Sequence, residues 1–378
     1  MIITLVTDQF YKNNNGTSVS SQQLCRELLK EGHTVRILTV DEENQTQYAL
    51  HERNFGVFNK LIHSQGMQLA KPDNKVIKQA ILGADIVHIF TPFKLGSRTI
   101  KLCRKLHIPF TVASHILPEN ITSSILLKNS KIVNRAIWSV WRKSIYKKAQ
   151  HIHCPSTMMA KQLEKHKIKS NLHVISNGFP SDYQMQTEEK PKIFQDKIII
   201  VATGRFSREK RYDLIFKAVK KSKNADKILL ILGGKGPLLK KFEKKGRKLP
   251  NMPVFLGKYQ REQQLSFLNF ADIYIHAADI EVEGMTCLEA AACGCLPIVS
   301  NSSRSAAKQF VLHPQCLFKH GRAKDLASKI DWWIDHPDKL SQEKKKIAAH
   351  AQNFTLAKSM SLYRKMFLSA IDEHKKQA

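Results

Sequence analysis

The sequence lacks any apolar run long enough to cross a membrane. Spanning a bilayer takes roughly 20 consecutive apolar residues, and no run approaches that length in the 378 residues. The opening apolar run, 2–6, is followed at once by Asp8 and has neither a basic leader nor a cleavage site. We therefore expect a buried first strand there rather than a signal peptide.

Cysteine is also sparse. The seven cysteines are an odd number and show no zinc-type spacing, which argues against a disulfide framework and favours a reducing cytoplasm. Cys293 and Cys295 stand one residue apart, too close for the usual ligand pair. We interpret them as small core residues around Gly294.

Acidic residues are scarce: 32 Asp and Glu stand against 61 Lys and Arg, for a net charge of +29. Residues 1–85 carry nine basic and nine acidic side chains, whereas residues 86–170 carry sixteen basic side chains and only the acids Glu119 and Glu164. A segment this positive attracts polyanions, whether nucleic acid or an anionic lipid surface. A lysine-rich composition without a partner is the alternative.

Short β-branched runs alternate with helical periods along the whole chain. The expected strands are 2–6, 34–40, 85–90, 109–113, 151–154, 172–176, 197–204, 227–234, 253–257, 271–277 and 295–300. This alternation predicts parallel sheets wrapped by helices. The polar, turn-rich stretch 176–196 is the expected linker between two Rossmann-like domains, at 1–180 and 190–357. At 378 residues, two domains are also the natural expectation from length.

In such sheets a ligand binds beyond the carboxyl ends of the strands, at helix N-termini. Arg205 and Lys210 lie in the loop that follows strand 197–204, and two cations there suit a diphosphate. A solvated basic loop is the alternative. Gly16, in the loop after the first strand, could let the backbone approach a phosphate, or could lie in a plain loop.

Two acids frame the stretch EVEGMTCLEA. Glu281 follows a strand, while Glu289 lies in a helix expected to begin near Thr286, whose first amides form an anion site. Glu289 could then accept hydrogen bonds from a ribose diol, and Glu281 could meet sugar hydroxyls. A metal pair is disfavoured because no His or Asp partners the two acids at ligand spacing. A nucleophile and acid pair stays open.

Three stretches, GRFSREK, LLILGGKGP and EVEGMTCLEAAACGCLPIVSN, resemble the retaining glycosyltransferases of family four, which have the GT-B fold. That fold is two Rossmann-like domains facing across a cleft, with a C-terminal helix, here about 358–378, that crosses back to the first domain. The resemblance implies that Arg205 and Lys210 bind the diphosphate of a nucleotide sugar. It also implies that Glu281 contacts the donor sugar and Glu289 the ribose.

The resemblance implies further donor contacts. The amides of Gly284, Met285 and Thr286 would bind phosphate and sugar, and uracil would lie near Lys258 and Tyr259. His115 matches the family's histidine beside the transferred sugar. Departures are a single glycine, Gly16, where the family often has a Gly-Gly pair, and Val282-Glu283 in place of a Pro-Phe type pair.

The stretch 121–149 contains no acid and places Ile137, Trp138, Trp141 and Ile145 at helical spacing. A helix with aromatic residues and a cationic rim can lie in a bilayer interface. An ordinary amphipathic helix with a buried apolar face is the alternative. The expected membrane-binding residues are Lys128, Lys131, Arg135, Trp138, Trp141, Arg142, Lys143, Lys147 and Lys148.

We therefore expect a peripheral enzyme on the cytoplasmic face of the cell membrane, similar to bacterial lipid glycosyltransferases. It would move glucose or galactose from a UDP-sugar to a lipid hydroxyl such as that of diacylglycerol, ceramide or a glycolipid, with retention and without a metal or other cofactor. One alternative is a polyprenyl-linked or soluble saccharide acceptor, as in capsule or lipopolysaccharide synthesis. The other is a basic nucleic-acid-binding protein; because no stacking motif is evident, we expect no nucleic-acid partner.

Overall fold

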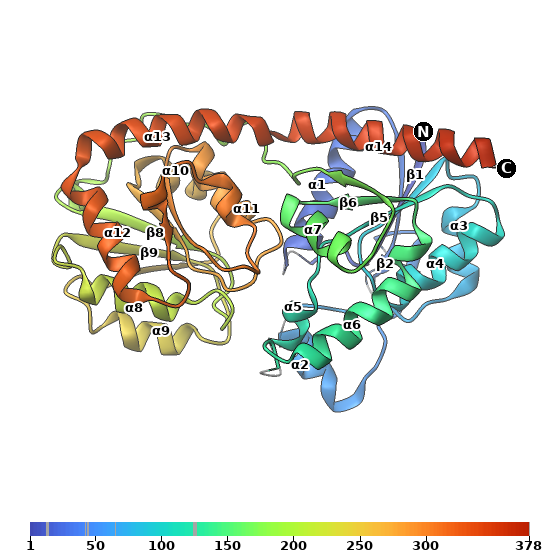
Figure 1. Cartoon of the computed structure of the whole chain (residues 1–378), viewed down its shortest axis with the longest axis horizontal. Coiled ribbons are helices and arrows are strands. Elements are labelled where there is room, and N and C mark those ends of the chain that lie inside the picture. Colours follow the sequence, from blue (N-terminus) through green and yellow to red (C-terminus); the bar gives the residue numbers. More distant parts are fainter. Residues whose placement is uncertain (13–14, 42, 44, 65, 124–126, 378) are drawn as a thin grey trace. The chain divides into compact units, whose positions relative to one another are not determined.

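The computed structural model describes residues 1–378 except 13, 14, 42, 44, 65, 124–126 and 378. The chain forms two compact units; in Figure 1 the first is blue to green together with the red C-terminal helix, and the second runs from yellow-green to orange-red. The first unit comprises Met1–Asn177 and Ala357–Ala378, and the second comprises Gly178–Leu356. Each unit is organised around its own parallel sheet.

The first unit contains a seven-stranded sheet in the order β3-β2-β1-β4-β5-β6-β7. Every pairing within it is parallel. Its strands are β1 (Ile2–Gln9), β2 (Thr34–Val40), β3 (Tyr48–Leu50), β4 (Ile86–Ile89), β5 (Phe110–Ala113), β6 (His151–Cys154) and β7 (Asn171–Val174). The central strands are buried along almost their whole length, because helices cover both faces of such a sheet.

Helices connect these strands. They are α1 (Gly16–Lys30), α2 (Asn59–Ser64), α3 (Asn74–Ile81), α4 (Lys94–Lys105), α5 (Pro118–Thr122), α6 (Lys131–Ser144), α7 (Thr157–Lys165) and the short 3₁₀ turns η1 (Gly56–Phe58) and η2 (Tyr146–Lys148). The last helix, α14 (Leu356–Gln377), belongs to this unit from Ala357 onward. Its Tyr363 hydroxyl lies 3.1 Å from Nδ1 of His153 on β6, which confirms the expected return of the C-terminal helix to the first domain.

The second unit contains a six-stranded parallel sheet in the order β10-β9-β8-β11-β12-β13. Its strands are β8 (Ile198–Thr203), β9 (Ile228–Gly233), β10 (Val254–Gly257), β11 (Ile273–His276), β12 (Leu296–Ser300) and β13 (Leu317–Phe318). Its helices are α8 (Tyr212–Lys221), α9 (Leu239–Gly246), α10 (Arg261–Phe270), α11 (Met285–Ala292), α12 (Ala323–Asp335) and α13 (Pro337–Ala351). Four 3₁₀ turns complete it: η3 (Lys192–Phe194), η4 (Ala307–Phe310), η5 (Pro314–Cys316) and η6 (Gln352–Phe354).

The prediction of two Rossmann-like folds is confirmed, and each of the eleven expected strands has a counterpart in the sheets. Two edge strands, β3 and β13, were missed because three or two residues are too few to show a period. The boundary between the two units falls after Asn177, inside the expected linker 176–196, and the residues from Gly178 onward are grouped with the second unit. Phe179 and Tyr183 bury their rings in its core, so a polar composition conceals two aromatic anchors.

The strand order of the second unit positions its loops. Chain order reverses between β8 and β11, since β9 and β10 lie on one side of β8 while β11, β12 and β13 lie on the other. The loops that leave β8 and β11 therefore diverge from neighbouring strand ends and leave a crevice there, the usual ligand position in an open parallel sheet. Within the described residues, none of the helices has both the length and the apolar character that membrane crossing requires.

Candidate active site

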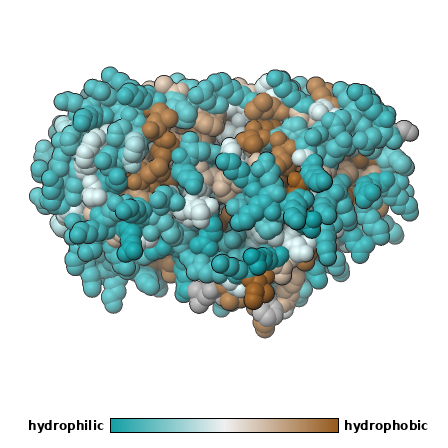
Figure 2. Space-filling view, viewed as in Figure 1, coloured by the Kyte–Doolittle hydropathy of each residue, from teal (hydrophilic) through white to brown (hydrophobic). Residues whose placement is uncertain are grey.

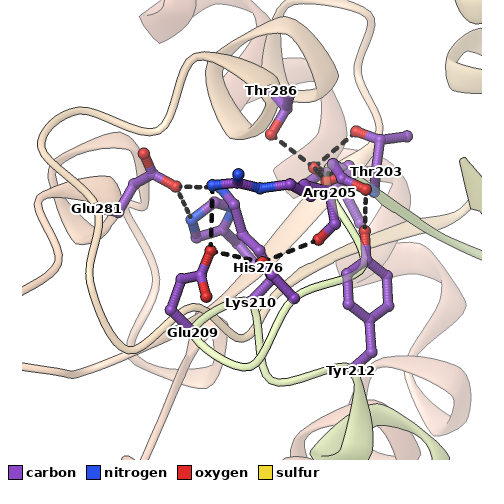
Figure 3. A network of polar contacts seen from close by, with 11 residues as sticks. Thr203, Arg205, Glu209, Lys210, Tyr212, His276, Glu281 and Thr286 are labelled. Carbon is purple, nitrogen blue, oxygen red and sulfur yellow. Dashed lines mark hydrogen bonds and ion pairs between the residues drawn. The ribbon is translucent and has the colours of Figure 1, made fainter. Parts of the chain in front are cut away.

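The loops after β8 and β11 bring together most of the residues expected to bind a donor. Arg205 and Lys210 lie between β8 and α8, and Glu281 lies between β11 and α11. Figure 3 shows their side chains converging with those of Thr203, His276 and Thr286. About 70 residues of sequence separate the two loops, and the parallel pairing of β8 with β11 joins them.

Two glycines after β9 shape the loop that carries Arg205. A Cβ on Gly234 would lie 2.0 Å from the carbonyl oxygen of Gly204, and a Cβ on Gly236 would lie 2.6 Å from the backbone of Phe206. This close approach allows the amide of Phe206 to donate to the carbonyl of Lys235 at 2.9 Å. The stretch LLILGGKGP therefore buttresses the loop that carries the cations.

Arg205 has an unsatisfied donor. Its Nη1 atom is buried without a hydrogen-bond partner, while Nη2 lies 3.6 Å from the carboxylate of Glu209. A buried guanidinium N–H without an acceptor is costly. A phosphate oxygen is the kind of acceptor that a guanidinium binds most strongly.

Lys210 and Glu281 form an ion pair across the two loops. The ammonium Nζ lies 2.6 Å from Oε2 of Glu281, and Nε2 of His276 lies 3.4 Å from the same oxygen. Burial by itself would raise the pKa of Glu281, but the charge of Lys210 and the hydrogen bond from His276 outweigh it and lower the pKa to about 2. Glu281 is therefore a fixed negative charge at neutral pH.

The backbone holds Glu281 and the start of α11 in place. The amide of Glu281 donates to the carbonyl of Arg304 at 3.0 Å, and its carbonyl accepts from Ala306 at 2.9 Å. Gly284 caps α11 with a φ of +101°, and a Cβ there would lie 2.8 Å from the Cβ of Ala307. Only glycine fits both constraints. The first turn of α11, from Met285, therefore presents its amides beside Glu281, as an anion site requires.

A chain of hydroxyl groups links this turn to β8. The Tyr274 hydroxyl donates to Thr286 at 2.9 Å and lies 3.0 Å from the hydroxyl of Thr203. Tyr274 and His276 are two residues apart on β11, and their rings stack with centroids 6.4 Å apart. Neither residue was expected at the site from the sequence. Polar side chains near the end of an otherwise apolar strand were the available signal.

Glu289 lies one turn further along α11 in a different environment. Its Oε2 accepts a hydrogen bond of 2.8 Å from Gln264, whose own oxygen accepts one from the Tyr183 hydroxyl at 3.2 Å. Burial raises the pKa of Glu289 to about 7, and the Gln264 hydrogen bond offsets this only in part. Across the described residues, no three His, Cys, Asp or Glu side chains converge as metal ligands would.

The expected uracil position lies near Glu289. The Tyr259 ring packs so closely over Gly233 that a Cβ there would lie 2.5 Å from it. Burial raises the pKa of Tyr259 to about 12, with the charge of Glu289 adding to the shift. Lys258 is exposed beside it. Tyr259 therefore borders both the turn after β9 and the acid expected to bind ribose.

The first unit contains the two remaining donor-side residues. His115 follows β5 and is buried; its ring stacks on Phe90 with centroids 5.6 Å apart, and its Nε2 has no partner. Burial, with His153 and His88 nearby, lowers the pKa of His115 well below its usual range, so the ring is neutral. Gly16 begins α1, and no atom lies within 4 Å of a Cβ built on it, so packing alone does not require glycine there.

The expected membrane segment needs a correction. Trp138 and Trp141 face the core of the first unit, each 4% exposed; Trp138 stacks on His166 and Trp141 meets Phe93 edge to face. The two tryptophans are therefore not available to a bilayer, as the amphipathic alternative anticipated. Residues 124–126 of the segment lie outside the described residues.

The opposite face of α6 is exposed and partly apolar. Ile132 is 81% exposed and Val140 is 62% exposed, and with exposed Ala136 they form one row at i, i+4 and i+8. All seven expected basic residues lie on or flank this helix and are exposed or half-buried. They are Lys128, Lys131, Arg135, Arg142, Lys143, Lys147 and Lys148.

Two family models match the chain side by side. The model described as Glycosyltransferase Family 4 matches residues 14–183, and the model described as Glycosyl transferases group 1 matches residues 184–353. An alpha-monoglucosyldiacylglycerol synthase of Streptococcus pneumoniae is 24% identical over 334 residues, covering 80% of this chain and 71% of that protein. A GDP-mannose-dependent alpha-mannosyltransferase of Corynebacterium glutamicum is 23% identical over 306 residues, covering 78% of this chain and 71% of that protein.

Solved structures share the fold. An Anabaena protein in complex with UDP and glucose superposes with a TM-score of 0.71 at 17% identity, covering 98% of this chain and 100% of that chain. A sucrose-phosphate synthase of Thermosynechococcus elongatus gives a TM-score of 0.74 at 16% identity, covering 97% and 99% respectively. At these identities the likeness is one of fold.

Proposed function

The chain belongs to the family 4 glycosyltransferases, and from that premise we propose that it transfers glucose or galactose from a UDP-sugar to a hydroxyl group of a membrane lipid with retention of configuration. Binding of the nucleotide-sugar donor is supported above all by Arg205, whose buried Nη1 atom has no hydrogen-bond partner. Lys210 and the first turn of α11 lie at the same site. These groups supply the positive charge and the amides that a diphosphate needs without calling on a metal.

The proposed reaction exchanges one bond at the anomeric carbon for another. The bond from that carbon to the diphosphate oxygen breaks while the acceptor hydroxyl attacks from the same face, and the departing phosphate takes the hydroxyl proton. Arg205, Lys210 and the amides of α11 stabilise the negative charge that develops on UDP. Glu281, held ionised by Lys210, accepts hydrogen bonds from the sugar.

The proposed role of His115 is to hydrogen-bond as a neutral ring rather than as a cation. Because its pKa is lowered by burial, the neutral ring can donate one hydrogen bond, and its Nε2 is free to make a new one. We propose that this bond goes to the transferred sugar. Glu289 would accept from the ribose diol, with Tyr259 beside the base.

The acceptor half of the proposal depends on α6. An exposed row of Ile132, Ala136 and Val140 flanked by lysine and arginine is the arrangement of an interfacial helix, which inserts its apolar row while its cations meet anionic headgroups. Figure 2 shows hydrophobic side chains at the lower tip of the first unit, where Figure 1 draws α2 and the blue loop beside it, below α6. The relative that makes a glucosyl lipid supports the same choice.

A nucleotide-release screen tests the proposal. UDP-glucose, UDP-galactose and GDP-mannose would each be offered with diacylglycerol, ceramide or glycolipid in mixed micelles, and with soluble saccharides, using Glu289→Ala as the inactive control. We expect UDP release that requires lipid. Release from GDP-mannose would assign the donor instead to the type used by the mannosyltransferase relative, and release with soluble saccharides alone would overturn the lipid acceptor.

Membrane binding is tested separately by vesicle flotation. Ile132→Ser/Val140→Ser should lose binding to vesicles that contain phosphatidylglycerol, while Ile193→Ser/Met252→Ser, at apolar positions of the second unit that are 82% and 66% exposed, serves as the matched control. Equal binding by all three proteins would contradict the role of α6.

A further inference from the structure

A second basic site lies in the first unit, away from the residues assigned to sugar transfer. A cavity of about 350 Å³ opens where β5 and β6 begin, with the end of α14 along its side. Its titratable and cationic lining residues are Arg104, His107, Lys147, Lys148, His151 and His374. We propose that this cavity binds the phosphate group of a small anionic ligand.

The position of the cavity separates it from the transfer site. β5 begins at Phe110, which lines the cavity, and the strand ends at Ala113, shortly before His115. The cavity therefore lies at the amino end of the sheet and His115 follows the carboxyl end. In open parallel sheets ligands of the main reaction bind at the carboxyl end, so this cavity has a separate use.

The lining combines exposed cations with a buried floor. Arg104, Lys147 and Lys148 are exposed at the rim, while Ile108 and His151 are buried beneath them, His151 at 1% exposure. None of the described lining residues is acidic. The charge of the lining is therefore at least +3 and remains positive when one nearby acid, Glu373, is included.

Glu373 is an acid close to the cavity and reduces its positive charge. Its Oε2 lies 3.2 Å from Nε2 of His151, and it also accepts a hydrogen bond from Gln150. This carboxylate orients two lining side chains and reduces the positive potential inside the cavity. The described residues of the lining include no acid to pair with Arg104, Lys147 and Lys148, so these cations remain available to a phosphate group.

The volume of the cavity and the charges of its lining indicate which class of ligand it could bind. A volume of about 350 Å³ is near the lower end of small-molecule sites, which start at roughly 300 Å³. That space suits a phosphate with a small polar body, such as glycerol phosphate, either free or as the headgroup of an anionic lipid. Arg104 can bind two phosphate oxygens through its planar guanidinium, and the two lysines act as point charges.

The test compares two triple variants of equal charge. Arg104→Gln/Lys147→Gln/Lys148→Gln removes the cations of the cavity, and Lys71→Gln/Lys75→Gln/Lys78→Gln removes three exposed lysines elsewhere in the first unit. Calorimetric titration with glycerol 3-phosphate measures the affinity for the soluble ligand. Flotation with phosphatidylcholine vesicles, with and without phosphatidylglycerol, measures the lipid form.

We expect binding in at least one arm to weaken roughly tenfold in the cavity variant and less than about twofold in the control. Loss confined to glycerol 3-phosphate assigns a soluble ligand. Loss confined to phosphatidylglycerol vesicles assigns a lipid headgroup when Arg104→Gln alone reproduces it; loss that requires the Lys147 and Lys148 changes belongs to the surface beside α6 and overturns the cavity site. Equal losses in both variants, or binding in neither arm, would overturn the proposal. Neither arm uses a sugar donor or acceptor, so the result does not depend on the proposed transfer reaction.

A single substitution supplies the opposite change. Glu373→Gln removes the negative charge beside His151 and leaves an amide able to hydrogen-bond in its place. Phosphate affinity should rise about two- to threefold, because one unfavourable charge near the ligand is gone. Weaker binding by a variant that unfolds at the wild-type temperature would count against a phosphate in this cavity.

Discussion

Glu289→Gln is the substitution that best separates the proposed donor site from an ordinary buried acid. Burial raises the pKa of Glu289 from its ordinary value of 4.5 to about 7. Glutamine keeps the size of the side chain and can still pair with the amide of Gln264. It cannot carry the negative charge that would accept strong hydrogen bonds from a ribose diol.

The pKa sets the size of the effect on binding. With a pKa near 7, about one tenth of Glu289 is ionised at pH 6 and about nine tenths at pH 8. If only the carboxylate binds the diol, the Kd of UDP-glucose should fall about tenfold between pH 6 and pH 8. UDP-glucose is the suitable probe because its diphosphate has no ionisation in that interval, whereas free UDP does.

The same pKa predicts that folding stability falls over the pH range in which donor binding strengthens. The folded state holds the Glu289 proton more tightly than the unfolded chain, so its contribution to stability is present below pH 4.5 and is lost as pH rises through about 7. Allowing for partial exposure, the ionised acid costs about 1–3 kcal/mol at pH 8. Glu289→Gln should therefore raise the unfolding temperature at pH 8 while weakening donor binding, a trade expected at functional sites.

Calorimetry at pH 6, 7 and 8 and thermal unfolding at pH 8 measure both effects. We expect a tenfold slope in the wild type and a flat, weaker profile in the variant. Burial lowers the pKa of His276 below the ordinary 6.5, which moves its ionisation toward or below the acidic end of this range. A flat wild-type profile, a slope that persists in Glu289→Gln, or a less stable variant would each refute the reasoning.

Three further predictions follow from single contacts. Arg205→Ala should raise the KM for the donor by about 10- to 100-fold in steady-state kinetics, because a charged hydrogen-bond donor to phosphate is lost; an unchanged KM would remove Arg205 from the site. Gly234→Ala should lower the unfolding temperature and activity together, since its Cβ would lie 2.0 Å from the carbonyl oxygen of Gly204; wild-type stability would contradict the close approach. The first unit should lose up to about 3 kcal/mol of stability as pH falls from 6.5 toward 4, because burial lowers the pKa of His153 to about 4 and the unfolded chain takes the proton first; hydrogen exchange in β6 and α14 measures it, and protection that does not change with pH would exclude it.

Much of the fold was predictable because its strands are long enough to be read as apolar runs. β1 and β8 each extend over six or more residues with nearly continuous burial. The failures have physical causes. β13 has two residues, too few for a pattern, and the polar stretch 178–196 conceals Phe179 and Tyr183, whose burial depends on a core built from distant strands.

The site was predictable in its residue types and less so in its contacts. The spacing of Glu281 and Glu289 places both acids around one helix start, as expected. Pairing of Glu281 with Lys210 depends on β8 lying next to β11, which no local pattern contains. α6 shows the converse: its sequence predicts one apolar face with Trp138 and Trp141, but only tertiary packing decides that Trp138 is covered while Ile132 is exposed.

The two acids of the motif have opposite electrostatic states for one reason, the distribution of partners. Burial raises the pKa of both, yet Glu281 has the ammonium of Lys210 at 2.6 Å and its pKa falls to about 2. Glu289 has the neutral amide of Gln264 at 2.8 Å and its pKa rises to about 7. A basic chain can therefore keep one permanent charge and one acid close to its ionisation point. Under the proposed function, the first would position the sugar, and the second would become fully charged when the ribose supplies the hydrogen bonds that water no longer can.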